Sequence, residues 1–238
     1  MIRGAAVRRA SASIVVGALT IASVVGCAPE RTPTPTTSTS PSWVSTYETP
    51  EPTELAPLRG TTVLAGSLDH ASIAAKIDNH WDARPQVGLE LTDIVFEELV
   101  EGGITRYVAV WQSTIPELLG PVRSIRPMDP DIVSPFGGII CYSGGQQRFV
   151  NLMRQTPVYN AIHGQPDTSK TFFRTNTKRS PHDVLVRATE VLAQHTDIAP
   201  PAQQFAYSLD AATSMAATDG TPTAVVEYRF SSLYYGTW

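Results

Sequence analysis

The chain has 238 residues, of which 18 are lysine or arginine and 22 are aspartate or glutamate, so its formal net charge is −4. Proteins that bind nucleic acids usually carry a basic face, and this acidic balance gives no support for one. It also argues against broad adhesion to anionic lipids or anionic wall polymers, except through a local patch.

Residues 1–26 have the features of a secretory signal peptide. Their positive region contains Arg3, Arg8 and Arg9. The apolar stretch 14–25 is short for a membrane-spanning helix, which needs about 20 apolar residues. Small residues then lead to Cys27, as in a lipobox, where the thiol receives a diacylglycerol and the chain is cut before the cysteine. An ordinary signal peptide with a chance cysteine is the alternative. Cleavage leaves 15 basic and 22 acidic residues, a net charge of −7.

Residues 27–59 are rich in proline, threonine and serine. Such a stretch cannot bury enough apolar surface to offset its ordering entropy, so we expect a disordered tether. At about 3.1 Å per residue, roughly 30 residues reach up to about 90 Å. Trp43 and Tyr47 depart from the polar pattern and are candidates for local docking.

Residues 60–200 are predicted to form an α/β (α+β) domain with a mixed β-sheet and flanking helices. Residues 71–78 indicate a strand. Two apolar runs, 94–101 and 104–112, are joined by Gly102 and Gly103 and indicate a hairpin. Strand alternation then places Glu97 and Glu101 on one face and Glu98 on the other.

The remaining elements are predicted from apolar spacing. They are a loop or short helix at 127–135, a buried strand at 137–142, a helix at 146–155, irregular chain at 156–181, a helix at 181–195 and a strand at 224–230. The helix at 146–155 has Phe149, Leu152 and Met153 on one stripe. The helix at 181–195 has these apolar residues at helical spacing: Val184, Leu185, Ala188, Val191 and Leu192. Residues 201–238 are expected to begin a second β-containing domain that the sequence truncates. Cys141 is predicted to be a small buried hydrophobe, and with Cys27 acylated no disulfide can form within the chain.

Two clusters of polar residues adjoin the predicted strands. The first is Asp78, Asn79, His80, Asp82 and Arg84, which form either a loop-borne site or a solvated turn. The second is Glu97, Glu98 and Glu101 with Arg106. Its carboxylates are candidates for general acid–base work if burial raises a pKa, and the alternative is a cross-strand ion pair.

Two further clusters lie in the connecting segments. Arg123 and Arg126 lie between two prolines, with Ser124 between the arginines, and are suited either to an anion or to carboxylates inside the protein. His163, Arg174, His182 and Asp183 make the fourth cluster, in which Asp183 is expected to cap a helix. The spacing of His163, His182 and His195 does not support a metal site, so we predict no metal and no cofactor. A Ser/His/Asp triad using Ser124 or Ser143 has little weight, since nearly any chain of this length allows one on paper.

These segments resemble one family. The stretches KIDNHWDARPQVGLELTDIVFEELVEGGITRYVAVWQS, GPVRSIRP, YSGG and RSPHDVL are similar, in order and spacing, to the YerB-like lipoproteins, catalogued as domain of unknown function 3048. The resemblance covers residues 71–195. It implies a lipoprotein of Gram-positive bacteria, with an α/β domain followed by a smaller β-containing domain. It supplies no reaction, cofactor or catalytic residue. Asp183 stands where relatives tend to have asparagine, which puts a neutral hydrogen-bonding role there in doubt.

Three functions are compatible with the sequence. The first is a membrane-anchored, extracytoplasmic binding or accessory module for a cell-wall component or an envelope protein. The second is a structural domain with an internal ion network. The third is an envelope hydrolase or transferase with Glu97 or Glu101 as base and His182 as acid. We favour the binding module, with these candidate ligand-binding residues: Asp78, Asn79, Arg84, Glu97, Glu101, Arg106, Arg123, Ser124, Arg126 and His182.

Overall fold

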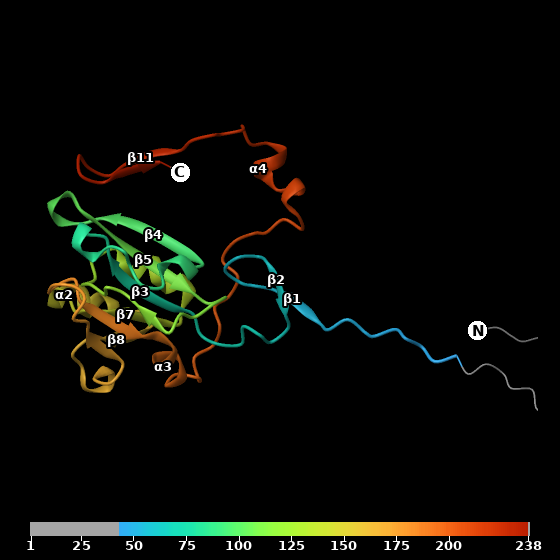
Figure 1. Ribbon diagram of the computed structural model, residues 1–238, viewed down its shortest axis with the longest axis horizontal. Helices are drawn as coiled ribbons and strands as arrows, with labels where there is room; N and C mark the ends of the chain where they lie inside the picture. The colour runs from blue at the N-terminus through green and yellow to red at the C-terminus, as the bar shows by residue number, and fades with distance from the viewer. Residues whose placement is uncertain (1–42, 238) are drawn as a thin grey trace, which may run out of the picture. The chain divides into compact units, whose positions relative to one another are not determined.

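The computed structural model describes residues 43–237 (Figure 1). The predicted signal peptide, the lipobox at Cys27 and the first part of the tether lie outside the described residues. Residues 1–48 and 49–238 are separate units, and the account below concerns the second. Trp43 and Tyr47, which the sequence analysis names as candidates for local docking, belong to the first unit and are 84% and 74% exposed.

A five-stranded mixed sheet is the centre of the domain, with strand order β4-β5-β3-β7-β8 (Figure 1). Its strands are β3 (Ile73–Asp78), β4 (Ile94–Leu99), β5 (Thr105–Trp111), β7 (Ile139–Tyr142) and β8 (Tyr159–Ile162). β3 is antiparallel to β5 and parallel to β7, and β7 is parallel to β8. The predicted hairpin is confirmed, because β4 and β5 are antiparallel neighbours joined by the turn η3 (Glu101–Gly103). The predicted α+β class is also confirmed.

Both faces of this sheet are covered, which explains why β3 is buried along its whole length. One face packs against a three-stranded sheet of β6 (Leu118–Leu119), β10 (Val184–Arg187) and β9 (Phe172–Arg174), and against α3 (Ala188–Ala193). The other face packs against α1 (Asp129–Val133) and α2 (Gln147–Met153). Cys141 lies fully buried in the first of these layers, as predicted, and burial raises the pKa of its thiol.

The helix predicted over residues 181–195 is wrong in its first half. β10 pairs with β6 and with β9, so Val184 and Val186 enter the core with strand alternation, and the helix begins only at Ala188. The segment 156–181, predicted as irregular, contains β8, β9 and the short helix η5 (Pro166–Thr168). In α2, Val150 is buried whereas Leu152 is 44% exposed, so Leu152 does not belong to the buried stripe.

Ordered structure begins within the segment that the sequence analysis assigns to the tether. β1 (Thr53–Leu55) pairs with β2 (Thr62–Leu64), and Leu58 is buried. The remaining elements are η1 (Trp81–Ala83), η2 (Leu89–Leu91), η4 (Ser134–Phe136), η6 (Ala211–Thr213), α4 (Met215–Thr218), β11 (Glu227–Arg229) and β12 (Tyr235–Thr237). β11 is the strand predicted at 224–230, and it pairs with β12. Within residues 43–237 no helix combines the length and the apolar character needed to cross a membrane.

Candidate functional site

The polar residues that follow β3 are buried at the end of the central sheet. Asp78 and Asn79 are each 1% exposed. β3 is the middle strand, so the chain leaves the sheet between β5 and β7 and turns at once into η1. Buried polar groups need hydrogen-bond partners, and both side chains find several here.

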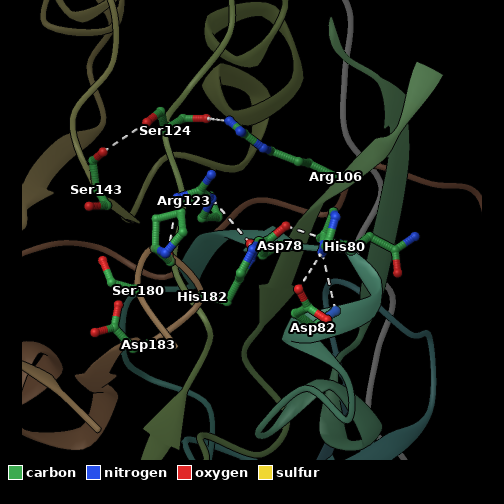
Figure 2. A network of polar contacts seen from close by, with 12 residues as sticks. Asp78, His80, Asp82, Arg106, Arg123, Ser124, Ser143, Ser180, His182 and Asp183 are labelled. Carbon is green, nitrogen blue, oxygen red and sulfur yellow. Dashed lines mark hydrogen bonds and ion pairs between the residues drawn. The ribbon is translucent and has the colours of Figure 1, made fainter. Parts of the chain in front are cut away.

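Asp78 organises the first part of the site (Figure 2). Its Oδ2 lies 2.6 Å from Nδ1 of His182 and 3.1 Å from Nε of Arg123. His182 is 104 positions away from Asp78 in the sequence. Its Oδ1 accepts the backbone N–H of His80 at 3.1 Å. Arg123 also donates to the carbonyl of Pro181 at 3.0 Å, so the loop before β10 is held against the end of β3.

Asn79 organises the second part. Its amide nitrogen donates to Oγ1 of Thr105 at 2.7 Å and to Oε1 of Glu97 at 3.3 Å. Its Oδ1 accepts from Nη2 of Arg84 at 2.8 Å and from Nε2 of Gln86 at 3.2 Å. Asn79 therefore fixes a carboxylate on one side and a guanidinium on the other.

A cavity of about 320 Å³ opens over these groups. Its polar floor and aromatic walls are formed by Asn79, Trp81, Arg84, Gln86, Glu97, Tyr107, Tyr228, Leu233, Tyr234 and Tyr235. The rings of Trp81 and Tyr234 are 5.4 Å apart, and the guanidinium of Arg84 lies 4.4 Å from the Trp81 ring centre. Tyr234 is 3% exposed, and its hydroxyl donates to the carbonyl of Asn79 at 2.8 Å.

Three phenols around this cavity, those of Tyr107, Tyr228 and Tyr234, remain neutral and able to donate hydrogen bonds. Burial, followed by the charge of Glu97, raises the pKa of Tyr107 to about 12. Burial also raises the pKa of Tyr228 and of Tyr234. Of the described residues that line the cavity, none is a serine, cysteine or histidine. The cavity thus offers hydrogen bonds, one carboxylate, one guanidinium and ring faces.

The other predicted site residues are paired within the protein. Arg126 donates to Oε2 of Glu101 through Nε at 2.8 Å and Nη2 at 2.6 Å. The hydrogen bond from Arg126 holds the pKa of Glu101 below its usual value. Arg123 instead contacts Asp78, so the two arginines have different carboxylate partners.

Arg106 and Ser124 hold the backbone beside the site. Nη1 of Arg106 donates to the carbonyl of Ser124 at 2.6 Å, and burial lowers the pKa of Arg106 to about 10. The hydroxyl of Ser124 donates to the carbonyl of Ser143 at 3.0 Å. His182 contacts Asp78 and His80, whereas Glu97 and Glu101 are bonded to Asn79 and Arg126 respectively.

The histidines considered as metal ligands in the sequence analysis have different surroundings. His163 lies against Phe172 and Ser143, and His195 lies 3.8 Å from the ring of Tyr159. His182 is stacked on His80, with ring centres 4.6 Å apart. Asp183 does not cap a helix, because it precedes β10, where its carboxylate accepts from Arg174 at 2.6 Å.

A buried ion cluster between β3, β4 and α1 was not among the predicted sites. Nζ of Lys76 donates to Oε2 of Glu98 and, at 2.7 Å, to Oδ1 of Asp129. All three side chains are at most 7% exposed. The sequence signals were Glu98, which the sequence analysis placed in the second polar cluster, and Lys76, a lysine that follows three apolar residues of β3. The surrounding core makes this cluster a structural element of the domain.

Comparisons with known proteins agree with this architecture. The family model described as "Protein of unknown function (DUF3048) N-terminal domain" matches residues 58–199. A protein named "Putative lipoprotein YerB" from Bacillus subtilis (strain 168) is 28% identical over 193 residues, which are 74% of this chain and 56% of that protein. The crystal structure of YerB from Bacillus subtilis superposes with a TM-score of 0.55 at 28% identity, covering 62% of this chain and 53% of that one. The chain therefore spans about half the length of these relatives.

Proposed function

Because the chain belongs to the DUF3048 family of proteins of unknown function, we propose that it is a lipid-anchored binding module of the cell envelope. Its anchor is the diacylglycerol on Cys27, and its domain faces the extracytoplasmic side of the membrane. The signal-like sequence before Cys27 supports the anchor, as does the name of the Bacillus subtilis relative, which describes a lipoprotein. The cavity after β3 supports the binding role.

The observation on which the binding role rests is the fixed arrangement of polar groups in that cavity. Glu97 is held by Thr105 at 2.7 Å, and Arg84 is held by Asn79 and by the ring of Trp81. Because these side chains are already held in place, binding a ligand does not require the loss of side-chain conformational entropy. A volume of about 320 Å³ lies at the small end of the range for ligand sites.

The chemistry of the lining indicates the class of ligand. Glu97 accepts from an amine or a hydroxyl, Arg84 and Gln86 donate to a carboxylate or a carbonyl, and the tyrosine and tryptophan rings pack on apolar or sugar faces. A short peptide or wall fragment that carries both amine and carboxyl groups satisfies all three. The lining has no evident nucleophile among its described residues, which favours binding over hydrolysis.

Titration calorimetry with wall-derived peptides and amino-sugar fragments tests the binding role. We expect saturable binding that Glu97→Gln and Arg84→Ala each weaken by about 1–3 kcal/mol, because each leaves a buried ligand group unpaired. Glu90→Gln and Arg148→Ala are matched controls. Glu90 is an exposed glutamate outside the cavity, and Arg148 is an exposed arginine on the ring of Phe149. Binding that survives both cavity variants would place the ligand elsewhere.

A separate experiment tests the anchor. Mass spectrometry of the mature protein is expected to find a diacylglycerol on Cys27, and Cys27→Ser is expected to move the protein out of the membrane fraction. An unmodified thiol at Cys27, or full-length precursor in the cytosol of wild-type cells, contradicts the anchor without bearing on the cavity.

A further inference from the structure

A second group of side chains lies at the end of β3, where the loop before β10 meets the turn η1. His80, Asp82 and His182 each contribute one ligand atom, and these atoms lie within 4.8 Å of one another. Figure 2 shows the two imidazoles and the carboxylate gathered around the turn at residues 80–82. The side chain of Asp82 is 72% exposed and that of His80 is 33% exposed, so the group opens to solvent.

We propose that His80, Asp82 and His182 bind one divalent transition-metal ion of the zinc class. Two imidazole nitrogens and one carboxylate oxygen are ligands that Zn²⁺ prefers, and imidazole also suits Ni²⁺, Cu²⁺ and Fe²⁺. Three protein ligands are the number found in zinc sites that keep one position open. The proposal differs from the sequence-based expectation because His80 and His182 are brought together only by the fold.

Asp78 supplies the support that such a site needs. Histidine ligands of metals usually give their second ring N–H to a carboxylate, which fixes the tautomer and the ring orientation. Oδ2 of Asp78 lies 2.6 Å from Nδ1 of His182, so the Nδ1–H tautomer leaves Nε2 unprotonated for a metal. Oδ1 of the same carboxylate accepts the backbone N–H of His80. One buried side chain therefore positions both histidines.

The metal-free geometry must adjust to bind an ion. The three ligand atoms lie within 4.8 Å of one another, and the imidazoles of His80 and His182, stacked with an interplanar angle of 16°, must tilt so that both lone pairs point to one ion. Ligand atoms around tetrahedral zinc lie roughly 3.4 Å apart, given bonds of about 2.0–2.1 Å. Nδ1 of His80 and Oδ2 of Asp82 are 3.7 Å apart. Nδ1 of His80 now accepts the backbone N–H of Asp82 at 3.2 Å, and the metal takes the place of this long contact. Asp82 can move inward because it is exposed and lies on the three-residue turn η1.

Positive charge nearby limits the affinity. Arg123 shares the carboxylate of Asp78, and Asp82 also lines a shallow hollow with Arg84, Lys178 and Arg179. We therefore expect binding in the micromolar range rather than the permanent retention seen in structural zinc sites. The same cations favour an anionic group or hydroxide at the open position of the metal.

Titration of the purified full-length chain with Zn²⁺, and with Co²⁺ followed by visible absorption, tests the site. We expect one ion per chain. His80→Ala, His182→Ala and Asp82→Ala should each weaken binding by more than about 10-fold, and Asp78→Asn by about 10- to 100-fold. His70→Ala is the matched control, since His70 contacts the backbone carbonyl of Ala71 outside the group.

Circular dichroism of each variant separates loss of the metal from loss of the fold. Asp82→Ala gives a clear result even if a histidine variant unfolds, because the Asp82 side chain is mostly in solvent. The proposal is overturned if the wild-type chain shows no saturable binding at micromolar metal concentrations. It is equally overturned if a folded His80→Ala, His182→Ala double variant binds as the wild type does.

Discussion

The buried ion cluster makes the stability of the domain depend on pH in an unusual direction. Burial, assisted by the negative charge of Asp129 and opposed by Lys76, raises the pKa of Glu98 from 4.5 to about 7. The folded state therefore holds this proton more tightly than the unfolded state does. As the pH rises through the interval from 4.5 to about 7, the contribution of Glu98 to the free energy of unfolding therefore falls.

The size of this effect follows from the shift. Each pKa unit corresponds to about 1.36 kcal/mol, so Glu98 lowers the free energy of unfolding by up to about 3 kcal/mol across the interval. Most proteins gain stability in this range as carboxylates ionise, so a loss is diagnostic. Glu98→Gln retains the shape and removes the titration, and this variant is expected to lose the part of the pH dependence that Glu98 contributes.

Urea denaturation at several pH values between about 5 and 8 measures the effect directly. Glu90→Gln is the control, because Glu90 is exposed and its loss should leave the slope unchanged. Because other groups, such as His163 with its lowered pKa, add opposite slopes, the test is the free energy of unfolding of the wild type minus that of Glu98→Gln, which should fall as the pH rises. An unchanged slope in Glu98→Gln refutes the reasoning.

Three further predictions concern the core. Lys76→Met should cost about 3–5 kcal/mol in urea denaturation, because it leaves two buried carboxylates without a cation; a loss below about 1 kcal/mol would contradict this. Gly138→Ala should abolish or severely weaken folding, since Gly138 has φ +68° and a Cβ there would lie 2.3 Å from the carbonyl oxygen of Ser72. Gly144→Ala is the control, because Gly144 is also at positive φ but a Cβ there meets no atom within 4 Å, and this variant should lower the free energy of unfolding less. In a Cys27→Ser background, Cys141 should react with a thiol reagent only at the rate of unfolding, because its thiol is buried; fast labelling of the folded protein would contradict this.

The hairpin of β4 and β5 could be predicted from sequence because both of its signals are local. Two β-branched runs meet at Gly102 and Gly103, and Gly102 adopts φ 72°. The alternation that separated Glu97 from Glu98 is also confirmed, since Glu98 lies on Lys76 and Glu97 on Asn79. The alternation of side chains along a strand determines which residues share a face, and this does not depend on distant parts of the chain.

The segment around β10 could not be predicted in this way. The apolar residues at 184, 185 and 188 fit helical spacing, but the pairing of β10 with β6 and β9 decides its conformation. Tertiary partners override local propensity in such short runs. The short strands β8 and β9 depend on neighbours in the same way.

Of the residues that line the cavity, Asn79, Arg84 and Glu97 were among the candidates from the sequence, whereas the aromatic walls were not. Asp78 and Asn79 were recognised as the end of a strand, and the structure places both in hydrogen-bond networks. The pairing of Asp78 with His182 and the closure of the cavity by Tyr234 join distant parts of the chain. No local pattern encodes either contact.

The hydroxyl of Tyr234 donates to the carbonyl of Asn79, and this contact has a thermodynamic consequence. Tyr234 lines the cavity but lies outside the 58–199 range of the family domain, so the ligand binding proposed above would be coupled to the position of the segment that contains Tyr234. Such coupling is reciprocal. If a ligand shifts the equilibrium of this segment toward its docked position by a certain factor, then a contact that fixes the segment in that position raises the affinity for the ligand by the same factor.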